Sequence, residues 1–159
     1  MKINLYILLL LFSVPFLVSC SQKRADVLVA KKGLLDLRNW DLKKKGPILL
    51  SGEWEFFWGS LYTPKDFSML SNKKIKYINV PHFFKNIKDH GKKDLNTGFA
   101  TYRLEVILNK KYNEIAFHVP MIGTAFNCYI NKEKVFYAGT VGKNKIDTQP
   151  EYKNFVTTI

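Results

Sequence analysis

The side chains that could carry acid–base or metal chemistry are few and lie far apart in this sequence. Its three histidines are His82, His90 and His118, and no two of them have the short spacing with which a pair of histidines binds one metal ion. His118 stands between two apolar residues of an expected strand, where a histidine is more often a satisfied sheet residue than a ligand. The sequence also has no Gly-x-Ser-x-Gly motif and no phosphate-binding glycine loop. These patterns predict a protein that is not an enzyme, with no catalytic residues, no metal site and no cofactor.

Glu53 and Glu55 would share one face of an extended chain, as paired catalytic carboxylates do. Glycoside hydrolysis needs two carboxylates about 5–10 Å apart across a sugar cleft. These two glutamates flank Trp54, however, and a tryptophan in an alternating run is typical of a core. We therefore expect Glu53 and Glu55 to lie on a solvated face.

Binding chemistry is better represented, because the chain is rich in aromatic residues. Aromatic faces stack on sugar rings, and polar groups beside them donate hydrogen bonds. Candidates near expected loops or strand ends are Trp40, Trp58, Tyr62, His82, Phe83 and Phe84. Arg103 could meet an anionic ligand, or it could pair with Glu105 or a carboxylate of a neighbouring strand. We take Trp58, His82 and Arg103 as the candidate ligand-binding residues; the alternative is that the aromatic side chains simply fill a small core.

The net charge of +12, from 25 Lys and Arg against 13 Asp and Glu, raises the question of nucleic-acid binding. The lysines are spread along the whole chain, and arginine, which reads bases best, is rare. We expect no nucleic-acid partner. Attraction to anionic lipid headgroups or to polyanionic glycans stays open as a use of the charge.

Short apolar or alternating runs, each ended by Gly, Pro or Asn, fill the chain from residue 33 onward and predict an all-β fold. The expected strands cover residues 52–58, 75–80, 100–108, 114–119, 124–131 and 135–139. The last two are expected to form a hairpin through Asn131-Lys132-Glu133-Lys134. Only residues 63–70 suggest a short helix. Strands joined by short connections indicate an antiparallel sandwich.

The amino terminus has the pattern of an export signal. A charged start is followed by an uncharged run over residues 5–18, shorter than the roughly 20 apolar residues that cross a bilayer comfortably. The run ends in Leu17-Val18-Ser19-Cys20 and resembles the lipobox of bacterial lipoproteins, in which the cysteine is acylated and the chain is cut before it. An ordinary signal peptide with an incidental cysteine and an uncleaved anchor are the alternatives.

The lipobox resemblance implies a lipoprotein signal peptide over 1–19, acylation of Cys20 and a lipidated tether over 20–32. The protein would then be anchored in membrane lipid in the cell envelope, facing the periplasm or the cell exterior. Cys128 would be the only remaining thiol, which leaves no intramolecular disulfide. Its place in an alternating apolar run predicts a buried structural thiol.

Several runs together resemble a known family of extracytoplasmic domains. They are Gly33-Leu34-Leu35-Asp36-Leu37-Arg38-Asn39-Trp40, Leu50-Ser51-Gly52-Glu53-Trp54-Glu55-Phe56, Val80-Pro81, Gly98-Phe99-Ala100-Thr101-Tyr102-Arg103-Leu104 and Tyr129-Ile130-Asn131. Their order resembles the periplasmic sensor domain of bacterial seven-transmembrane receptors with diverse intracellular signalling modules. It is similar, more loosely, to the amino-terminal sugar-binding domain of family 2 glycoside hydrolases. Both resemblances imply a galactose-binding-like jelly-roll β-sandwich over residues 33–159.

Two departures from that family pattern matter. Lys132 stands where the hydrolase relatives usually have Gly, although Asn131 can itself adopt a positive φ. The sequence stops at Ile159, inside an apparent strand that begins near Tyr152. We therefore expect a jelly roll that is incomplete at its carboxyl end, either as a fragment or with a protein partner that completes the sandwich.

Three functions stay open on these grounds. The first is a membrane-tethered, non-catalytic sensory or ligand-binding module whose ligand is a carbohydrate or another small molecule. The second is the remnant of an accessory sugar-binding domain of a family 2 glycoside hydrolase. The third is a structural surface lipoprotein that makes protein contacts.

Overall fold

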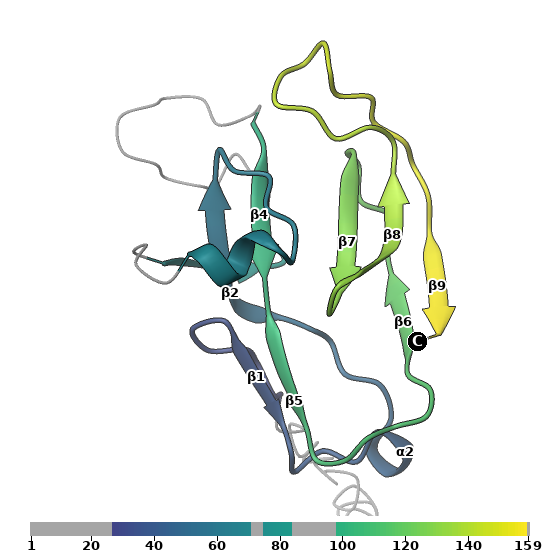
Figure 1. Ribbon diagram of the computed structural model, residues 1–159. Helices are drawn as coiled ribbons and strands as arrows, with labels where there is room; N and C mark the ends of the chain where they lie inside the picture. Colours follow the sequence, from purple (N-terminus) through teal and green to yellow (C-terminus); the bar gives the residue numbers. More distant parts are fainter. Residues whose placement is uncertain (1–26, 71–74, 84–97, 159) are drawn as a thin grey trace, which may run out of the picture.

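A computed structural model of the chain describes residues 27–70, 75–83 and 98–158 (Figure 1). The expected signal peptide over 1–19, Cys20, most of the tether, Phe84 and His90 lie outside the described residues. In the described part of the chain, no helix combines the length and the apolar character needed to span a bilayer. Strands dominate the regular structure, so the predicted all-β class is confirmed.

The strands are short. They are β1 (Leu34–Leu37), β2 (Gly52–Trp58), β3 (Lys76–Val80), β4 (Ala100–Arg103), β5 (Glu105–Leu108), β6 (Ala116–Val119), β7 (Phe126–Ile130), β8 (Glu133–Ala138) and β9 (Phe155–Thr158). Two helical turns accompany them, α2 (Leu42–Lys45) and the 3-10 helix η1 (Asp66–Met69). The expected helix over 63–70 is thus a 3-10 turn, in which the Thr63 amide and hydroxyl both donate to Asp66 Oδ2 at 2.7 Å.

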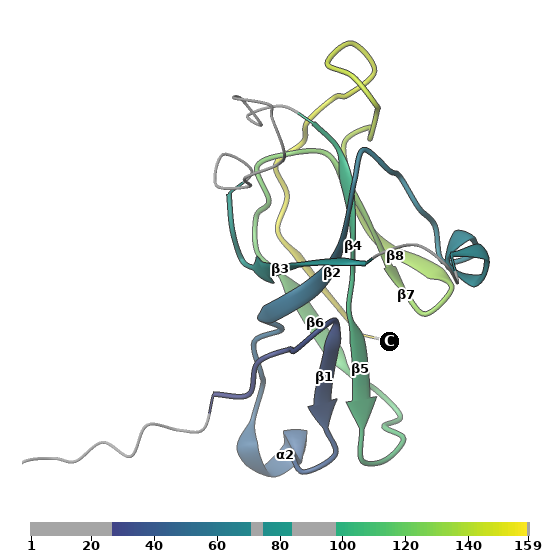
Figure 2. The same cartoon turned by 90° about the vertical axis from the view of Figure 1, so that its left-hand side faces the viewer.

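The strands form small sheets in two halves of the molecule (Figure 1). One half holds the antiparallel sheet β3-β2-β4 and the pair β1-β5, and the other holds the antiparallel pairs β6-β9 and β7-β8. β1 and β5 run parallel to each other, so the prediction of a purely antiparallel arrangement is wrong for this pair. Figure 2 shows that β1 and β5 extend toward the same end of the molecule as α2.

The stretch 100–108, predicted as one strand, is divided at Leu104. Its first part is β4, which pairs with β2, and its second part is β5, which pairs with β1. Leu104 itself packs against the apolar cluster around Leu35 and Leu37. The two parts thus have different neighbours, since β4 is antiparallel to β2 and β5 is parallel to β1.

The first half has a core that includes residues before position 33. Ala30, Leu35 and Leu37 are 1–2% exposed, and Leu28 packs against them. Ala30 also exchanges backbone hydrogen bonds with the start of β2, donating to Ser51 and accepting from Glu53. Part of the segment that composition assigned to the tether over 20–32 is therefore packed against the folded domain.

Close approach of two backbones explains the glycine at the start of β2. Gly52 has φ +108°, and a Cβ at this position would overlap the backbone of Ala30. Only glycine adopts that φ without strain and leaves room for the second chain. Gly52 therefore lets the segment before β1 pack directly against β2.

The second half is built on aromatic packing. Phe155 of β9 contacts Phe126 and Phe136 with ring centroids 5.7 and 5.5 Å apart. Cys128 lies opposite Phe136 and is half-buried, and this burial raises the pKa of its thiol. The β7-β8 hairpin turns at Asn131, whose φ is +56°, so the expected hairpin and the positive φ are both confirmed.

Candidate functional site

The central strand β2 separates two sets of candidate residues. Side chains alternate between the faces of a strand, and residues directly opposite each other on paired strands share a face. Phe56 lies opposite Tyr102, whereas Glu55 lies opposite Arg103. The sheet β3-β2-β4 consequently has two chemically different sides, which we name the His82 face and the Arg103 face.

The His82 face is an aromatic cluster around Phe56, which is 2% exposed. The ring centroid of Phe56 lies 6.0 Å from that of Trp58, 5.1 Å from that of Tyr102 and 6.5 Å from that of His82. Trp58, Tyr102 and His82 are all half-buried, so each ring is partly accessible from outside. The cluster therefore combines a packed centre with an accessible rim.

A polar contact joins two of these rings. His82 Nε2 lies 2.9 Å from the Tyr102 hydroxyl, and His82 Nδ1 lies 3.2 Å from the carbonyl oxygen of Phe83. A carbonyl only accepts, so the Nδ1 contact requires a proton on that nitrogen. In the neutral ring Nε2 then accepts from the Tyr102 hydroxyl. Burial raises the pKa of Tyr102, which keeps this hydroxyl protonated and able to donate.

The position of Trp58 depends on a glycine across the sheet. A Cβ at Gly98 would overlap the indole of Trp58, so the ring lies directly against the backbone there. Gly98 begins the run Gly98–Leu104 that leads into β4. The same short run therefore supplies the space for Trp58 and, four residues later, the hydroxyl of Tyr102.

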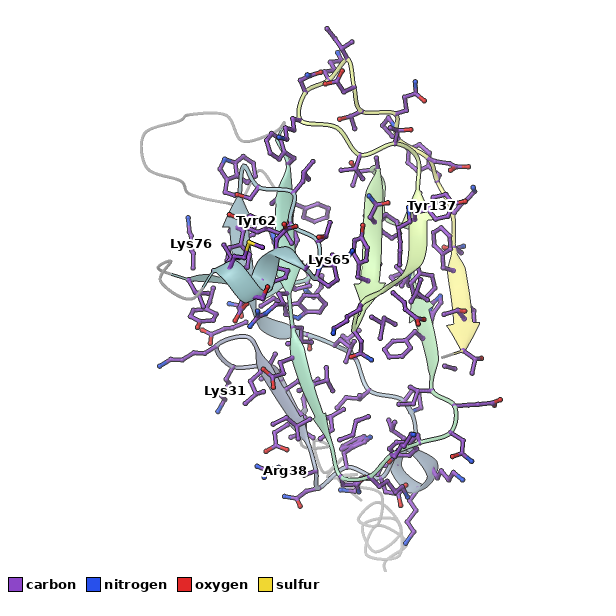
Figure 3. All side chains as sticks on the ribbon, in the orientation of Figure 1. Lys31, Arg38, Tyr62, Lys65, Lys76 and Tyr137 are labelled. Carbon is purple, nitrogen blue, oxygen red and sulfur yellow. The ribbon has the colours of Figure 1, made fainter. Side chains whose placement is uncertain are left out.

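The Arg103 face holds an ion pair whose carboxylate is buried. Arg103 Nε lies 2.7 Å from Glu55 Oε2, and Arg103 Nη2 donates to Glu55 Oε1 at 3.2 Å. The guanidinium also lies over the ring of Phe67, 4.9 Å from its centroid. The ring of Phe67 in turn contacts the rings of Phe57 and Tyr62. Figure 3 shows Tyr62 beside β2 and β4.

Glu55 is 7% exposed, so the expectation of a solvated face is wrong for this residue. The turn at Gly33 covers it, and a Cβ at Gly33 would come 2.7 Å from Glu55 Cγ. Burial raises the pKa of Glu55, and the charge of Arg103 opposes that shift. The interpretation of Arg103 as the partner of a carboxylate on a neighbouring strand is confirmed, with Glu55 rather than Glu105 as the partner.

The structure brings together two of the three candidate ligand residues. Trp58 and His82 meet around Phe56, but Arg103 is on the other side of the sheet, so the three do not form one site. Tyr102 belongs to the site although sequence reasoning assigned it no role. Its position opposite Phe56 depends on the pairing of β2 with β4, and no local pattern in the sequence states which strands pair.

Two of the remaining aromatic candidates, Trp40 and Tyr62, pack within the folded domain. The indole of Trp40 donates from Nε1 to the carbonyl oxygen of Gly46 at 3.1 Å and packs against the core cluster. The ammonium of Lys45 lies over the indole ring of Trp40, 5.1 Å from its centroid. Tyr62 is part of the Phe57–Phe67 cluster on the Arg103 face.

Comparisons with protein-family models, curated proteins and solved structures found no match. Within residues 27–70, 75–83 and 98–158, no three His, Cys, Asp or Glu side chains lie close enough together to hold a metal ion. The candidate site is therefore described by its own chemistry: accessible aromatic rings beside one histidine–tyrosine hydrogen bond.

Proposed function

We propose that this chain is a non-catalytic ligand-binding module, held at a membrane outside the cytoplasm by acylated Cys20, and that its ligand site is the His82 face. The observation that carries the proposal is the His82–Tyr102 hydrogen bond of 2.9 Å set among partly accessible rings. Binding sites commonly combine such an apolar lining with a few oriented polar groups. In this proposal the histidine–tyrosine pair serves recognition.

A carbohydrate suits this chemistry best. The indole of Trp58 offers a flat apolar face for the C–H side of a sugar ring, and the edge of His82 and the hydroxyl of Tyr102 exchange hydrogen bonds with sugar hydroxyls. Arg103, the candidate for meeting an anion, faces the other side of the sheet, where Glu55 pairs with it. Lys76 of β3, which lies opposite Phe56, is exposed. A neutral sugar is therefore favoured over an anionic ligand.

The resemblance to receptor sensor domains fits a role in sensing, with the jelly roll as the proposed architecture. The all-β fold and the arrangement of small sheets in two halves are compatible with such a sandwich. In this proposal a partner protein responds to ligand binding on the His82 face, and the bound ligand is not chemically changed. A family 2 hydrolase remnant would bind sugar in the same way, so the proposed site serves both interpretations.

A role in protein contacts has its own supporting observation. On the half formed by β6, β7, β8 and β9, Tyr137 and Val156 are 55% and 76% exposed, and Tyr152 is 67% exposed. These apolar side chains suit a structural lipoprotein or a partner that completes the sandwich.

Matched hydroxyl deletions test the site. The full chain is applied to a glycan array, and Tyr102→Phe is compared with Tyr62→Phe, which deletes the same group on the Arg103 face. We expect Tyr102→Phe to weaken retention of the bound sugar about tenfold, the value of one well-placed hydrogen bond, and Tyr62→Phe to leave it unchanged. Wild-type protein that retained no sugar at all would exclude the carbohydrate version.

The anchor is tested separately by labelling cells with palmitate. We expect label in the wild type and in Cys128→Ala, but none in Cys20→Ala, which should also leave the membrane fraction. Label in the Cys20→Ala protein would contradict the proposed lipidation.

A further inference from the structure

Parallel pairing of β1 with β5 collects basic side chains at one end of the molecule. Leu37 lies opposite Leu108, so both strands finish together, and the residues that follow each strand emerge at the same end. The chain after β1 continues through Arg38 into α2, and the chain after β5 continues into Lys110 and Lys111 (Figure 1, Figure 2). We name this surface the basic end; its side chains are Arg38, Lys43, Lys44, Lys45, Lys110 and Lys111.

Direct contacts hold the two segments of the basic end together. Lys110 Nζ lies 3.7 Å from Asp41 Oδ2, and Asp41 also accepts from the Lys43 amide at the start of α2 at 2.9 Å. Lys45 Nζ donates to the carbonyl oxygen of Asn39 at 3.1 Å. The basic residues therefore lie on α2 and on adjoining segments that contact it, rather than along a loose tail.

All the basic side chains of this end are exposed. Acidic side chains offset only part of their charge, because Asp36 pairs with Arg38 at 2.6 Å and Asp41 pairs with Lys110. The ion pairs of the described residues leave the ammonium groups of Lys43, Lys44 and Lys111 for an external anion. The basic end is thus a folded, outward-facing surface of positive charge.

We propose that the basic end docks on anionic lipid headgroups of the membrane that holds Cys20. This inference rests on the proposed lipid anchor. Leu28 packs against the core cluster that Leu37 and Leu108, the last residues of β1 and β5, also join. The covalent chain from Cys20 to Leu28 spans at most about 28 Å, so an anchored Cys20 keeps this half of the molecule close to the headgroups.

Lysine chemistry favours a lipid surface over a specific anion. Lysine ammonium groups act as mobile point charges and suit a diffuse layer of headgroup phosphates, whereas defined phosphate recognition usually employs arginine forks. Docking of this kind acts within about 10 Å at moderate ionic strength and weakens with added salt. It would orient the domain with the basic end toward the bilayer.

Lysine footprinting of the full-length protein tests the proposal. The protein is reconstituted in vesicles of phosphatidylcholine alone or with phosphatidylglycerol, and a membrane-impermeant amine reagent labels its lysines. We expect the five lysines of the basic end to be labelled at least about fivefold more slowly on the anionic vesicles, with protection lost in high salt. Lys143 and Lys145, in the β8–β9 connection at the opposite end in Figure 1, serve as internal references.

Matched variants separate this surface from total charge. Lys43→Gln/Lys44→Gln/Lys111→Gln should abolish the salt-sensitive protection of Lys45 and Lys110, and Lys132→Gln/Lys143→Gln/Lys145→Gln should preserve it. The three substituted lysines belong to α2 and to the segment after β5, whereas the ligand site is built from β2, β4 and the residues that follow β3.

Failure of docking is distinguishable from failure of the anchor. Palmitate-labelled, membrane-retained protein whose lysines react equally on both kinds of vesicle would overturn docking and leave the anchor standing. Protection by soluble heparin without protection by anionic vesicles would overturn the lipid assignment in favour of a polyanionic glycan. Protein without palmitate that is still protected on added anionic vesicles would support docking and refute the anchor.

Discussion

Glu55 and Arg103 face each other across β2 and β4, and their side chains form an ion pair in which the carboxylate is buried and the guanidinium is partly exposed. The side chain of Glu55 is 9% exposed and that of Arg103 is 40% exposed, with 2.7 Å between Oε2 and Nε. Phe67 covers one face of the guanidinium. The pair therefore fixes the Arg103 face of the sheet, while the candidate ligand site occupies the other.

Replacing Arg103 should destabilise the protein, because the buried carboxylate of Glu55 would lose its cationic partner. We expect Arg103→Met to lower the free energy of unfolding by about 1–3 kcal/mol at neutral pH, less than for a fully buried pair because water reaches the guanidinium. Chemical denaturation measures the change. Arg38→Met is the control, because its pair with Asp36 is exposed and should contribute little.

The free energy of unfolding that Arg103→Met loses should depend on pH in a defined direction. Burial raises the pKa of Glu55 above its ordinary value of 4.5, and Arg103 opposes this. A carboxyl whose folded pKa is raised contributes stability that is fully present below the unfolded pKa and is lost as the pH rises through the folded pKa. Removing Arg103 raises the folded pKa further, so the stability difference between Arg103→Met and wild type should shrink on acidification toward pH 4.5. A difference that grew in acid would contradict this account.

Gly98→Ala should displace Trp58. The added methyl group would overlap the indole, and overpacking of this kind costs about 1–3 kcal/mol. We expect a lower free energy of unfolding together with a shifted tryptophan emission. Gly123→Ala is the matched control, because its Cβ would make an ordinary contact of 3.6 Å with Tyr152. Equal effects of the two substitutions would show that Trp58 is not held against residue 98.

Tyr102→Phe should change the state of His82 as well as stability. Loss of one hydrogen bond lowers the free energy of unfolding by about 0.5–1.5 kcal/mol. Without the hydroxyl, Nε2 loses the donor that it accepts from, so the ring nitrogen chemical shifts should move toward a mixture of tautomers. Nitrogen NMR of the histidine ring measures this, and Tyr62→Phe should leave the His82 signals unchanged.

Local patterns in the sequence predicted much of the fold, including one hairpin, but not the pairing of strands that lie far apart in the chain. Alternation in residues 52–58 and the Asn131 turn were sufficient to place β2 and the β7-β8 hairpin. β1 was not predicted as a strand, and its partner β5 lies far along the chain. The change of partner at Leu104, from β2 to β1, involves strands that are distant in the chain, and no local pattern encodes it.

The candidate site was predictable in part for the same reason. Residue type singled out Trp58 and His82, and the structure brings them together around Phe56. Arg103, chosen alongside them, lies on the opposite face, because its side is decided by the register that places it opposite Glu55. Register is set by pairing between strands that are distant in the chain. Patterns within one strand therefore indicate which residue types could form a site, but not on which side of the sheet each of them lies.

The number of free thiols tests both the burial of Cys128 and the proposed acylation of Cys20. Burial raises the pKa of Cys128, so its reactive thiolate is scarce at neutral pH and the native protein should alkylate slowly. In denaturant the membrane-extracted full-length protein should react rapidly at Cys128 alone, because an acylated Cys20 has no free thiol. Mass spectrometry of the alkylated chain reads this directly, and Cys128→Ala should then take up no label. Label on both cysteines would refute acylation of Cys20, and rapid labelling of the native protein would refute the burial of Cys128.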